Sequence, residues 1–318
     1  MDCQRNNESM KINAITKSLL PILIGFLVWL LAVSNWLPYS IFELTHVQAL
    51  LIAVPLWLTP LSFSTTNYST PLIWLAVSCG IFFTIAYHLP QGMTAGILIL
   101  PWFAFSLFMA FKKWQVVKLF KNSFIEQQVE LAAYLYLPVG IFWAIVDRFG
   151  IQLLGYDSTI ILLTAIHFHY AGFILPQVTS WLIKNFPVKY SRLLGLGIIA
   201  GIPLVALGIS SSHFHWPDWI EVASVTIFTS AAASVGILHI WAGIKSPGVL
   251  PKVLFILGGL ALLIGMTLAF CYGWRSVFVI ETLTIPWMYA VHGTCNAVGF
   301  ALPVLIGWRI ILPCNNIS

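Results

Sequence analysis

Residues 251–272 read PKVLFILGGLALLIGMTLAFCY, a run of 22 residues whose one charged side chain, Lys252, lies at its edge. An α-helix rises about 1.5 Å per residue, so about 20 apolar residues cross the roughly 30 Å hydrocarbon core of a bilayer. The whole chain shares this character, because 59% of its 318 residues are hydrophobic and 8% are charged. Soluble domains average about 25% charged residues. The composition therefore predicts an integral membrane protein.

Nine other apolar runs can be read as spans in the same way, separated by Pro, Gly and charged residues. The ten candidate spans are residues 18–38, 40–60, 71–89, 93–111, 129–147, 158–183, 191–211, 218–243, 251–272 and 281–310. They predict an all-α fold, a polytopic transmembrane helix bundle of about ten spans in the lipid bilayer of the cell membrane. We expect one transmembrane domain over residues 18–312, between tails at 1–17 and 313–318.

The basic residues orient the bundle. If the N-terminus lies inside, an even number of spans places both termini on that side, and only Arg148 and Arg275 fall outside. The thirteen other basic residues fall inside: Arg5, Lys11, Lys17, Lys112, Lys113, Lys118, Lys121, Lys184, Lys189, Arg192, Lys245, Lys252 and Arg309. Cytoplasmic loops of membrane proteins carry an excess of Lys and Arg. Both termini are therefore predicted to be cytoplasmic.

The longest inner connection, between the fourth and fifth spans, is basic and patterned. Trp114, Val117, Phe120 and Phe124 recur there at helical spacing, opposite lysines. This pattern predicts an amphipathic helix near 112–128 that lies in the inner headgroup layer. A plain basic loop is the alternative.

Charge and cysteine content exclude two classes of function. The net charge of +5 comes from short connecting loops rather than one exposed face, so it does not predict nucleic-acid binding. The five cysteines are scattered and form no CxxC motif, so we expect no disulfide framework and no thiolate zinc site.

Two histidines lie deep in the sixth span. Counted from Ser158, His167 is about 14 Å and His169 about 17 Å from the outer surface. Residues two apart on a helix diverge by about 200°, so the two imidazoles face different neighbours. His167 shares its face with Thr164 and, less closely, Tyr170. Such deep imidazoles are costly unless they face a cavity, a ligand or one another, although each can also form a structural hydrogen bond to a carbonyl.

A third deep histidine lies in the last span. His292 is reached about 12–17 Å from the same surface, and Asn296, four residues on, shares its face. Neutral imidazole binds transition-metal ions and haem iron well. The predicted cofactor-binding residues are therefore His167, His169, His292, Tyr170 and Asn296, around a transition metal ion or haem.

Two acids at the start of the eighth span complete the candidate site. Asp218 and Glu221 lie three apart on one face, and Glu221 falls about one turn inside the interface. We expect Glu221 to be a fourth metal ligand, and either acid to be a catalytic base or entry group. Most acids at this outer rim are otherwise solvated helix ends.

The strings HFHYAGF at 167–173 and HGTCNAVGF at 292–300, on a polytopic chain, resemble the YndJ-like family of bacterial membrane proteins. The resemblance covers roughly residues 20–310 and extends to His167, His169, Tyr170, His292, Gly293 and Asn296; it is weaker at Asp218 and Glu221. It brings no activity with it. HFHY also resembles the core subunit of haem–copper oxidases, in which two such histidines bind two haems, but the other oxidase motifs are missing.

Three functions follow as hypotheses. The first is a metal or haem site that opens to the outer face, for metal-dependent hydrolysis of a small or lipid-like substrate or for electron transfer. The second is a transporter coupled to cations or protons, with helices broken at Pro203, Pro286 and Pro303. The third is a structural or assembly subunit.

Overall fold

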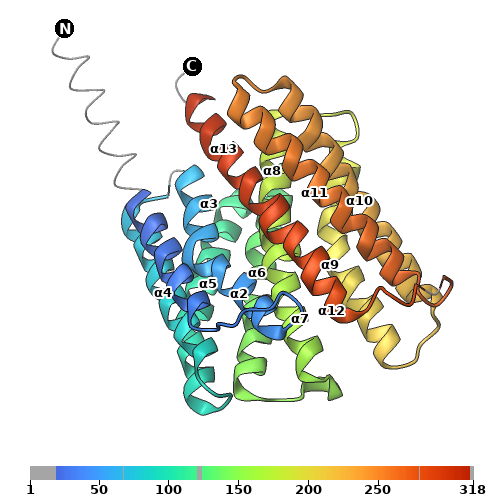
Figure 1. Cartoon of the computed structure of the whole chain (residues 1–318). Coiled ribbons are helices and arrows are strands. Elements are labelled where there is room, and N and C mark those ends of the chain that lie inside the picture. Colours follow the sequence, from blue (N-terminus) through green and yellow to red (C-terminus); the bar gives the residue numbers. More distant parts are fainter. Residues whose placement is uncertain (1–18, 67, 120–123, 279, 316–318) are drawn as a thin grey trace, which may run out of the picture.

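The computed structural model describes residues 19–66, 68–119, 124–278 and 280–315. These residues form helices joined by short loops, with no strand among them (Figure 1). Within hydrocarbon, an isolated segment can pair its backbone groups only as a helix. Nine of the described helices are long and apolar enough to cross a membrane, and Leu19–Ser34 is a shorter apolar helix. The predicted all-α polytopic bundle is confirmed.

The elements that follow Leu19–Ser34 share a pattern in which several long helices are built from shorter α-helical and π-helical pieces. The first half comprises α2 (Leu44–Ala53), η1 (Val54–Leu58), α3 (Thr59–Thr65), α4 (Thr70–His88), α5 (Met93–Leu119), α6 (Ile125–Phe149) and η2 (Leu153–Gly155). The second half comprises α7 (Ser158–His169), η3 (Tyr170–Ile174), α8 (Leu175–Asn185), α9 (Ser191–His213), α10 (Trp219–Lys245), α11 (Val249–Gly273), α12 (Ile285–Trp287), η4 (Met288–Gly293), η5 (Cys295–Ala301) and α13 (Leu302–Asn315).

Four stretches, η1, η3, η4 and η5, are π-helical, and each has a proline in it or two residues away: Pro55, Pro176, Pro286 and Pro303. Proline cannot donate the helical hydrogen bond and its ring clashes with the preceding turn, so the misfit of Pro176 and Pro303 falls in η3 and η5, which precede them. The helix break expected at Pro303 thus takes the form of a π-helical stretch, whereas Pro286 lies in the first turn of α12 and breaks no helix. The break expected at Pro203 is absent, because α9 continues through it.

The segment predicted as an interfacial helix near 112–128 is helical in its described residues but is not a separate element. Its first part continues α5 to Leu119, and its last part is the first turn of α6; residues 120–123 lie outside the described residues. Lys113 Nζ lies 2.6 Å from Glu130 Oε1 and ties α5 to α6. The amphipathic pattern therefore belongs to the adjoining ends of two long helices.

Small residues let the second-half helices approach closely. A Cβ placed on Gly259 of α11 would lie 2.4 Å from the carbonyl oxygen of Gly236 in α10. A Cβ on Gly197 of α9 would lie 3.0 Å from that of Ala231 in α10. Close backbone approach is typical of membrane helices, which have little hydrophobic drive to associate. The consequence is a layer of three helices, with α10 between α9 and α11.

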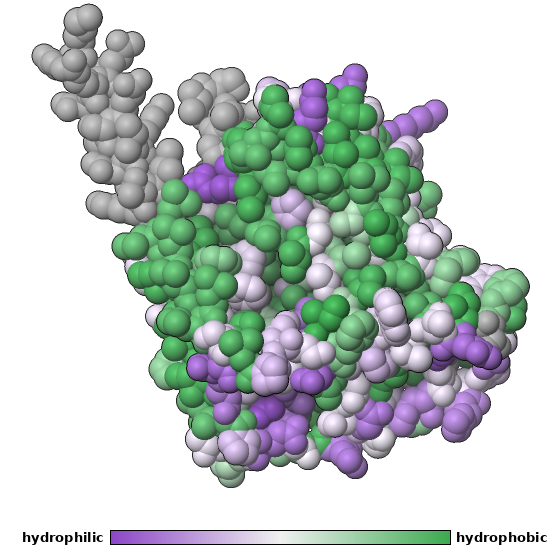
Figure 2. Space-filling model, viewed as in Figure 1, coloured by the Kyte–Doolittle hydropathy of each residue, from purple (hydrophilic) through white to green (hydrophobic). Residues whose placement is uncertain are grey.

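The surface matches a membrane-embedded body. Figure 2 shows apolar residues over most of one face, with hydrophilic residues gathered at one end and a smaller group at the opposite end. The first described helix begins, and α13 ends, at the same end of the bundle (Figure 1). An even number of crossings gives this arrangement.

Candidate functional site

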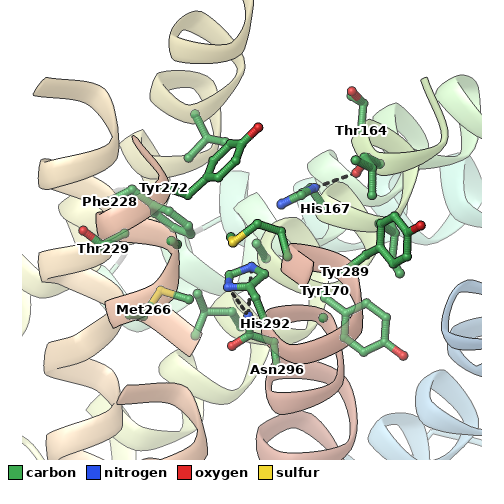
Figure 3. A pocket seen from close by; sticks show the side chains of 18 of the residues that line it. Thr164, His167, Tyr170, Phe228, Thr229, Met266, Tyr272, Tyr289, His292 and Asn296 are labelled. Atoms are coloured by element: carbon green, nitrogen blue, oxygen red, sulfur yellow. Dashed lines mark hydrogen bonds between the residues drawn. The ribbon is translucent and has the colours of Figure 1, made fainter. Parts of the chain in front are cut away.

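A partly open cavity of about 230 Å³ lies among α7, η3, α10, α11, η4 and η5 (Figure 3). Apolar side chains such as Ile160, Phe228 and Met266 form most of its wall. The polar residues that line it are Thr164, His167, Tyr170, Glu221, Thr229, Tyr272, Tyr289, His292 and Asn296. Five of the seven predicted site residues therefore line one cavity: His167, Tyr170, Glu221, His292 and Asn296.

His167 and His292 converge from remote parts of the chain. Their ring centroids are 6.3 Å apart, with 29° between the ring planes. His167 Nδ1 lies 2.6 Å from the carbonyl oxygen of Leu163, one helical turn earlier. A carbonyl only accepts, so Nδ1 carries the proton and Nε2 of the neutral ring keeps its lone pair. No hydrogen bond occupies that Nε2 among the described residues, and Figure 3 shows the His167 ring directed into the cavity.

His292 is held on both nitrogens. Its Nδ1 lies 2.8 Å from the carbonyl oxygen of Gly265 in α11. The amide nitrogen of Asn296 lies 3.1 Å from His292 Nε2 and donates to it (Figure 3). A Cβ on Gly265 would lie 2.5 Å from Asn296 Oδ1, so the glycine makes room for this arrangement. Asn296 is therefore a partner of His292, as its spacing predicted, and it occupies the nitrogen that a metal ion needs.

His169 faces away from the cavity. It is fully buried, and its Nδ1 donates to the carbonyl oxygen of Ala165 at 2.8 Å. Its ring packs against Phe83 of α4, with centroids 6.0 Å apart, and a Cβ on Gly140 of α6 would lie 2.9 Å from His169 Nδ1. The 200° divergence of the two histidines is therefore real. The structure does not bring His169 together with His167 and His292, because the helix that presents one turns the other toward α4 and α6.

Tyr170 lies where α7 passes into η3. Its ring lines the cavity, and its hydroxyl donates to the carbonyl oxygen of Leu50 in α2 at 2.8 Å. Single π-helical turns inside α-helices frequently lie at functional sites. Here Tyr170 in η3, His292 in η4 and Asn296 in η5 all line the cavity. The sequence patterns do not reveal these turns, since a π-turn differs from an α-turn by one residue.

The two acids have different positions. Glu221 lines the cavity, but its carboxylate is held by Arg275, with Arg275 Nη1 at 2.6 Å from Oε1 and Nη2 at 3.1 Å from Oε2. The guanidinium also lies 4.4 Å from the centroid of the Tyr272 ring. Asp218 is exposed at the start of α10 and does not line the cavity. Arg275 follows α11 directly, and no spacing in the sequence relates it to Glu221.

A further buried histidine, His46, braces the cavity wall. Its Nε2 lies 2.8 Å from Thr294 Oγ1, whose hydroxyl donates to the carbonyl oxygen of Ala290 at 2.5 Å. Tyr39 in the preceding loop hydrogen-bonds His46 Nδ1, and burial raises the pKa of Tyr39 to about 12, so its hydroxyl keeps the proton. The chain Tyr39–His46–Thr294 fastens α2 to the π-helical segment that carries His292. No sequence pattern marks this histidine, because Thr294 lies 248 residues away along the chain.

The residues do not fit the predicted metal or haem centre. Among the described residues, no group of three or more His, Cys, Asp or Glu side chains is placed to hold a metal ion. His169 points elsewhere, His292 Nε2 is capped by Asn296, and Glu221 is paired with Arg275. A cavity of about 150 Å³ holds benzene, so a haem, several times larger, exceeds the 230 Å³ available.

Comparison with known proteins decides the family. The model of the family described as YndJ-like protein matches residues 45–300, which include both HFHYAGF and HGTCNAVGF. The chain belongs to the YndJ-like family. The family resemblance drawn from those two strings is thereby confirmed, and all residues that line the cavity of this YndJ-like protein except Ala301 lie within the matched region.

A YndJ-like relative from Bacillus subtilis (strain 168), named "Uncharacterized membrane protein YndJ", is 31% identical over 216 residues. The alignment covers 66% of this chain and 38% of that relative, so the chain matches well under half of the relative's length. No solved structure matches the chain at a significant level. The comparisons establish a YndJ-like membrane protein.

Proposed function

We propose that this YndJ-like protein binds a small amphipathic, lipid-like molecule in the cavity between His167 and His292. One observation carries the proposal: a partly open, mainly apolar cavity has an imidazole nitrogen, His167 Nε2, directed into it with no partner. Ligand sites are commonly apolar clefts with a few polar groups that orient the ligand. A ligand group that donates to this nitrogen gains a hydrogen bond, with a net contribution of about 1 kcal/mol.

The orientation of the bundle gives the cavity an outward-facing position. Glu221 and Arg275, at its rim, belong to the end assigned to the outer surface by the excess of Lys and Arg at the other end. We therefore place the site in the outer half of the cell membrane, with both termini cytoplasmic. The ligand then enters from the outer leaflet or the extracytoplasmic side.

The other hypotheses have less support. Metal-dependent hydrolysis needs a free carboxylate and two free imidazoles, whereas Glu221 and His292 are both occupied. Transport through a broken seventh span loses its basis, since α9 is continuous through Pro203. A purely structural role does not explain why His167 Nε2 faces an open cavity with no partner among the described residues.

A cavity-filling variant tests the proposal. Ala269 of α11 lines the cavity, so Ala269→Trp places an indole in it, whereas Ala104→Trp adds the same side chain at an exposed position of α5. Mass spectrometry should detect the same co-purified apolar small molecules in wild type and in Ala104→Trp. These molecules should be absent from purified Ala269→Trp. Equal small-molecule content in all three folded proteins contradicts the proposal.

A further inference from the structure

Four hydroxyl groups in the cavity wall donate their protons to backbone carbonyl oxygens. Thr164 donates to the carbonyl oxygen of Ile160 at 2.7 Å, and Thr229 donates to that of Val225 at 2.8 Å. Tyr170 and Tyr289 donate to the carbonyl oxygens of α2 residue Leu50 and of Phe42, at 2.8 and 2.6 Å. A hydroxyl has one proton and two lone pairs, so each of these oxygens can now only accept.

The two imidazoles follow the same rule. His167 and His292 each direct Nδ1–H at a backbone carbonyl, that of Leu163 and that of Gly265. His292 Nε2 already accepts from the Asn296 amide. His167 Nε2 is left as a free lone pair that faces the cavity, so a ligand that donates a proton to it gains a hydrogen bond.

Few donors remain for a ligand. The Tyr272 hydroxyl points away from His292 in Figure 3 but lines the cavity and has no acceptor among the described residues, whereas the guanidinium of Arg275 is engaged by the Glu221 carboxylate at the rim. Five side chains of the described wall thus keep lone pairs and have no proton left to donate: Thr164, Thr229, Tyr170, Tyr289 and His167. An anionic ligand is disfavoured there, because its oxygens meet acceptors at these five side chains and one unused donor, the Tyr272 hydroxyl, in the described wall.

From this pattern we infer that the ligand is an alcohol: an apolar body with one hydroxyl, whose proton is donated to His167 Nε2. The inference rests on the proposed function and narrows its ligand class. A neutral hydroxyl is favoured over an ammonium, since burying an ionised group in an apolar cavity costs far more than burying a neutral one. Scaled from the 150 Å³ cavity that holds benzene, the 230 Å³ here suits about nine non-hydrogen atoms.

Two isomeric compounds separate the effect of the hydroxyl group on binding from the effect of molecular size. 1-Octanol and heptyl methyl ether have the same atoms, but only the alcohol donates a hydrogen bond. Binding is measured as the rise in the melting temperature of the purified protein in detergent with added compound, which grows with ligand concentration over Kd. One hydrogen bond corresponds to roughly fivefold tighter binding. We expect 1-octanol to bind wild type about fivefold more tightly than the ether.

Variants locate the effect at one nitrogen. His167→Leu should bind both isomers equally, and His167→Gln, whose amide oxygen accepts, should restore part of the preference. Ala269→Trp controls for effects of alcohol on the micelle. If neither variant at position 167 folds, the comparison of the two isomers on wild type still decides.

The outcomes bear on different claims. Equal binding of both isomers by wild type, lost in Ala269→Trp, overturns the alcohol inference and leaves the proposed function standing. Tighter binding of octanoate than of 1-octanol also overturns the inference, because it requires donors in the wall. No difference between wild type and Ala269→Trp with any compound overturns the proposed function itself.

Discussion

At the scale of single residues, the site depends on which nitrogen or oxygen is already occupied. Two imidazoles 6.3 Å apart look like the start of a metal centre. The hydrogen bonds of Asn296 to one ring and of Leu163 to the other assign different roles to the two histidines. His292 is fixed in place, and His167 is available to a ligand.

The positions of these residues could be predicted in part from the sequence. Helical geometry alone separates His167 from His169 and pairs His292 with Asn296, and the structure places all four accordingly. The capping of His292 and the pairing of Glu221 with Arg275 could not be predicted. Both depend on how α10, α11 and η4 pack. The hydropathy of one helix does not determine how neighbouring helices are rotated about their own axes.

The Tyr170 hydroxyl provides the first stability test. Tyr170→Phe removes the hydrogen bond to the Leu50 carbonyl oxygen and retains the ring. We expect a loss of about 1 kcal/mol in the free energy of unfolding, rising to about 3 kcal/mol if the carbonyl stays unpaired. Thermal unfolding in detergent measures it. Tyr190→Phe, at an exposed tyrosine, is the matched control and should change stability by less than about 0.5 kcal/mol. Equal effects of the two changes contradict the assignment.

At the scale of elements, hydropathy predicts where helices lie but not how their turns are wound. The span predicted at 251–272 corresponds to α11 within two residues at each end. The spans predicted at 158–183 and 281–310 contain η3, η4 and η5. Hydropathy does not indicate these π-helical stretches, since an apolar run has the same composition in an α-helix and in a wider turn. Proline positions hint at these turns, yet Pro203 lies in an unbroken helix.

The crossing of α10 and α11 tests the role of small residues. Gly259→Ala places a Cβ 2.4 Å from the Gly236 carbonyl oxygen, so the two helices must move apart. Overpacking of this kind costs about 1–3 kcal/mol, and thermal unfolding should report it. Gly293→Ala is the control, because its Cβ has a nearest neighbour at 3.7 Å. Stabilisation by Gly259→Ala contradicts the close approach.

At the scale of the whole molecule, the distribution of charge relates the bundle to its membrane. The first turn of α10 and the segment after α11 carry Glu221 and Arg275 near one end, whereas lysines such as Lys113 and Lys245 lie at the other. Nine of the ten predicted spans correspond to described helices long and apolar enough to cross a membrane, because each of those apolar runs is long enough by itself, whereas the first forms the shorter helix Leu19–Ser34. The order of the spans in space could not be predicted from the sequence, because it depends on side-chain packing between segments remote in the chain.

Thiol labelling in intact cells tests the orientation. In a chain whose native cysteines are replaced by serine, Trp216→Cys lies in the exposed loop before α10 and Lys189→Cys in the loop before α9. A membrane-impermeant maleimide should label position 216 in intact cells and position 189 only after permeabilisation, because the excess of Lys and Arg marks the cytoplasmic side. The reverse pattern contradicts the assigned orientation and the outward-facing cavity.

The π-helical turns also bear on how the chain tolerates changes of length. Deleting one residue from a continuous helix such as α10 rotates everything after it by about 100° and exchanges buried faces for lipid-facing ones. Deleting one residue from η3 converts a wide turn to an ordinary one and leaves the helices on either side in phase. Insertions and deletions among homologous chains are therefore expected to collect at these turns, beside the cavity, while the remainder of each helix keeps a constant length.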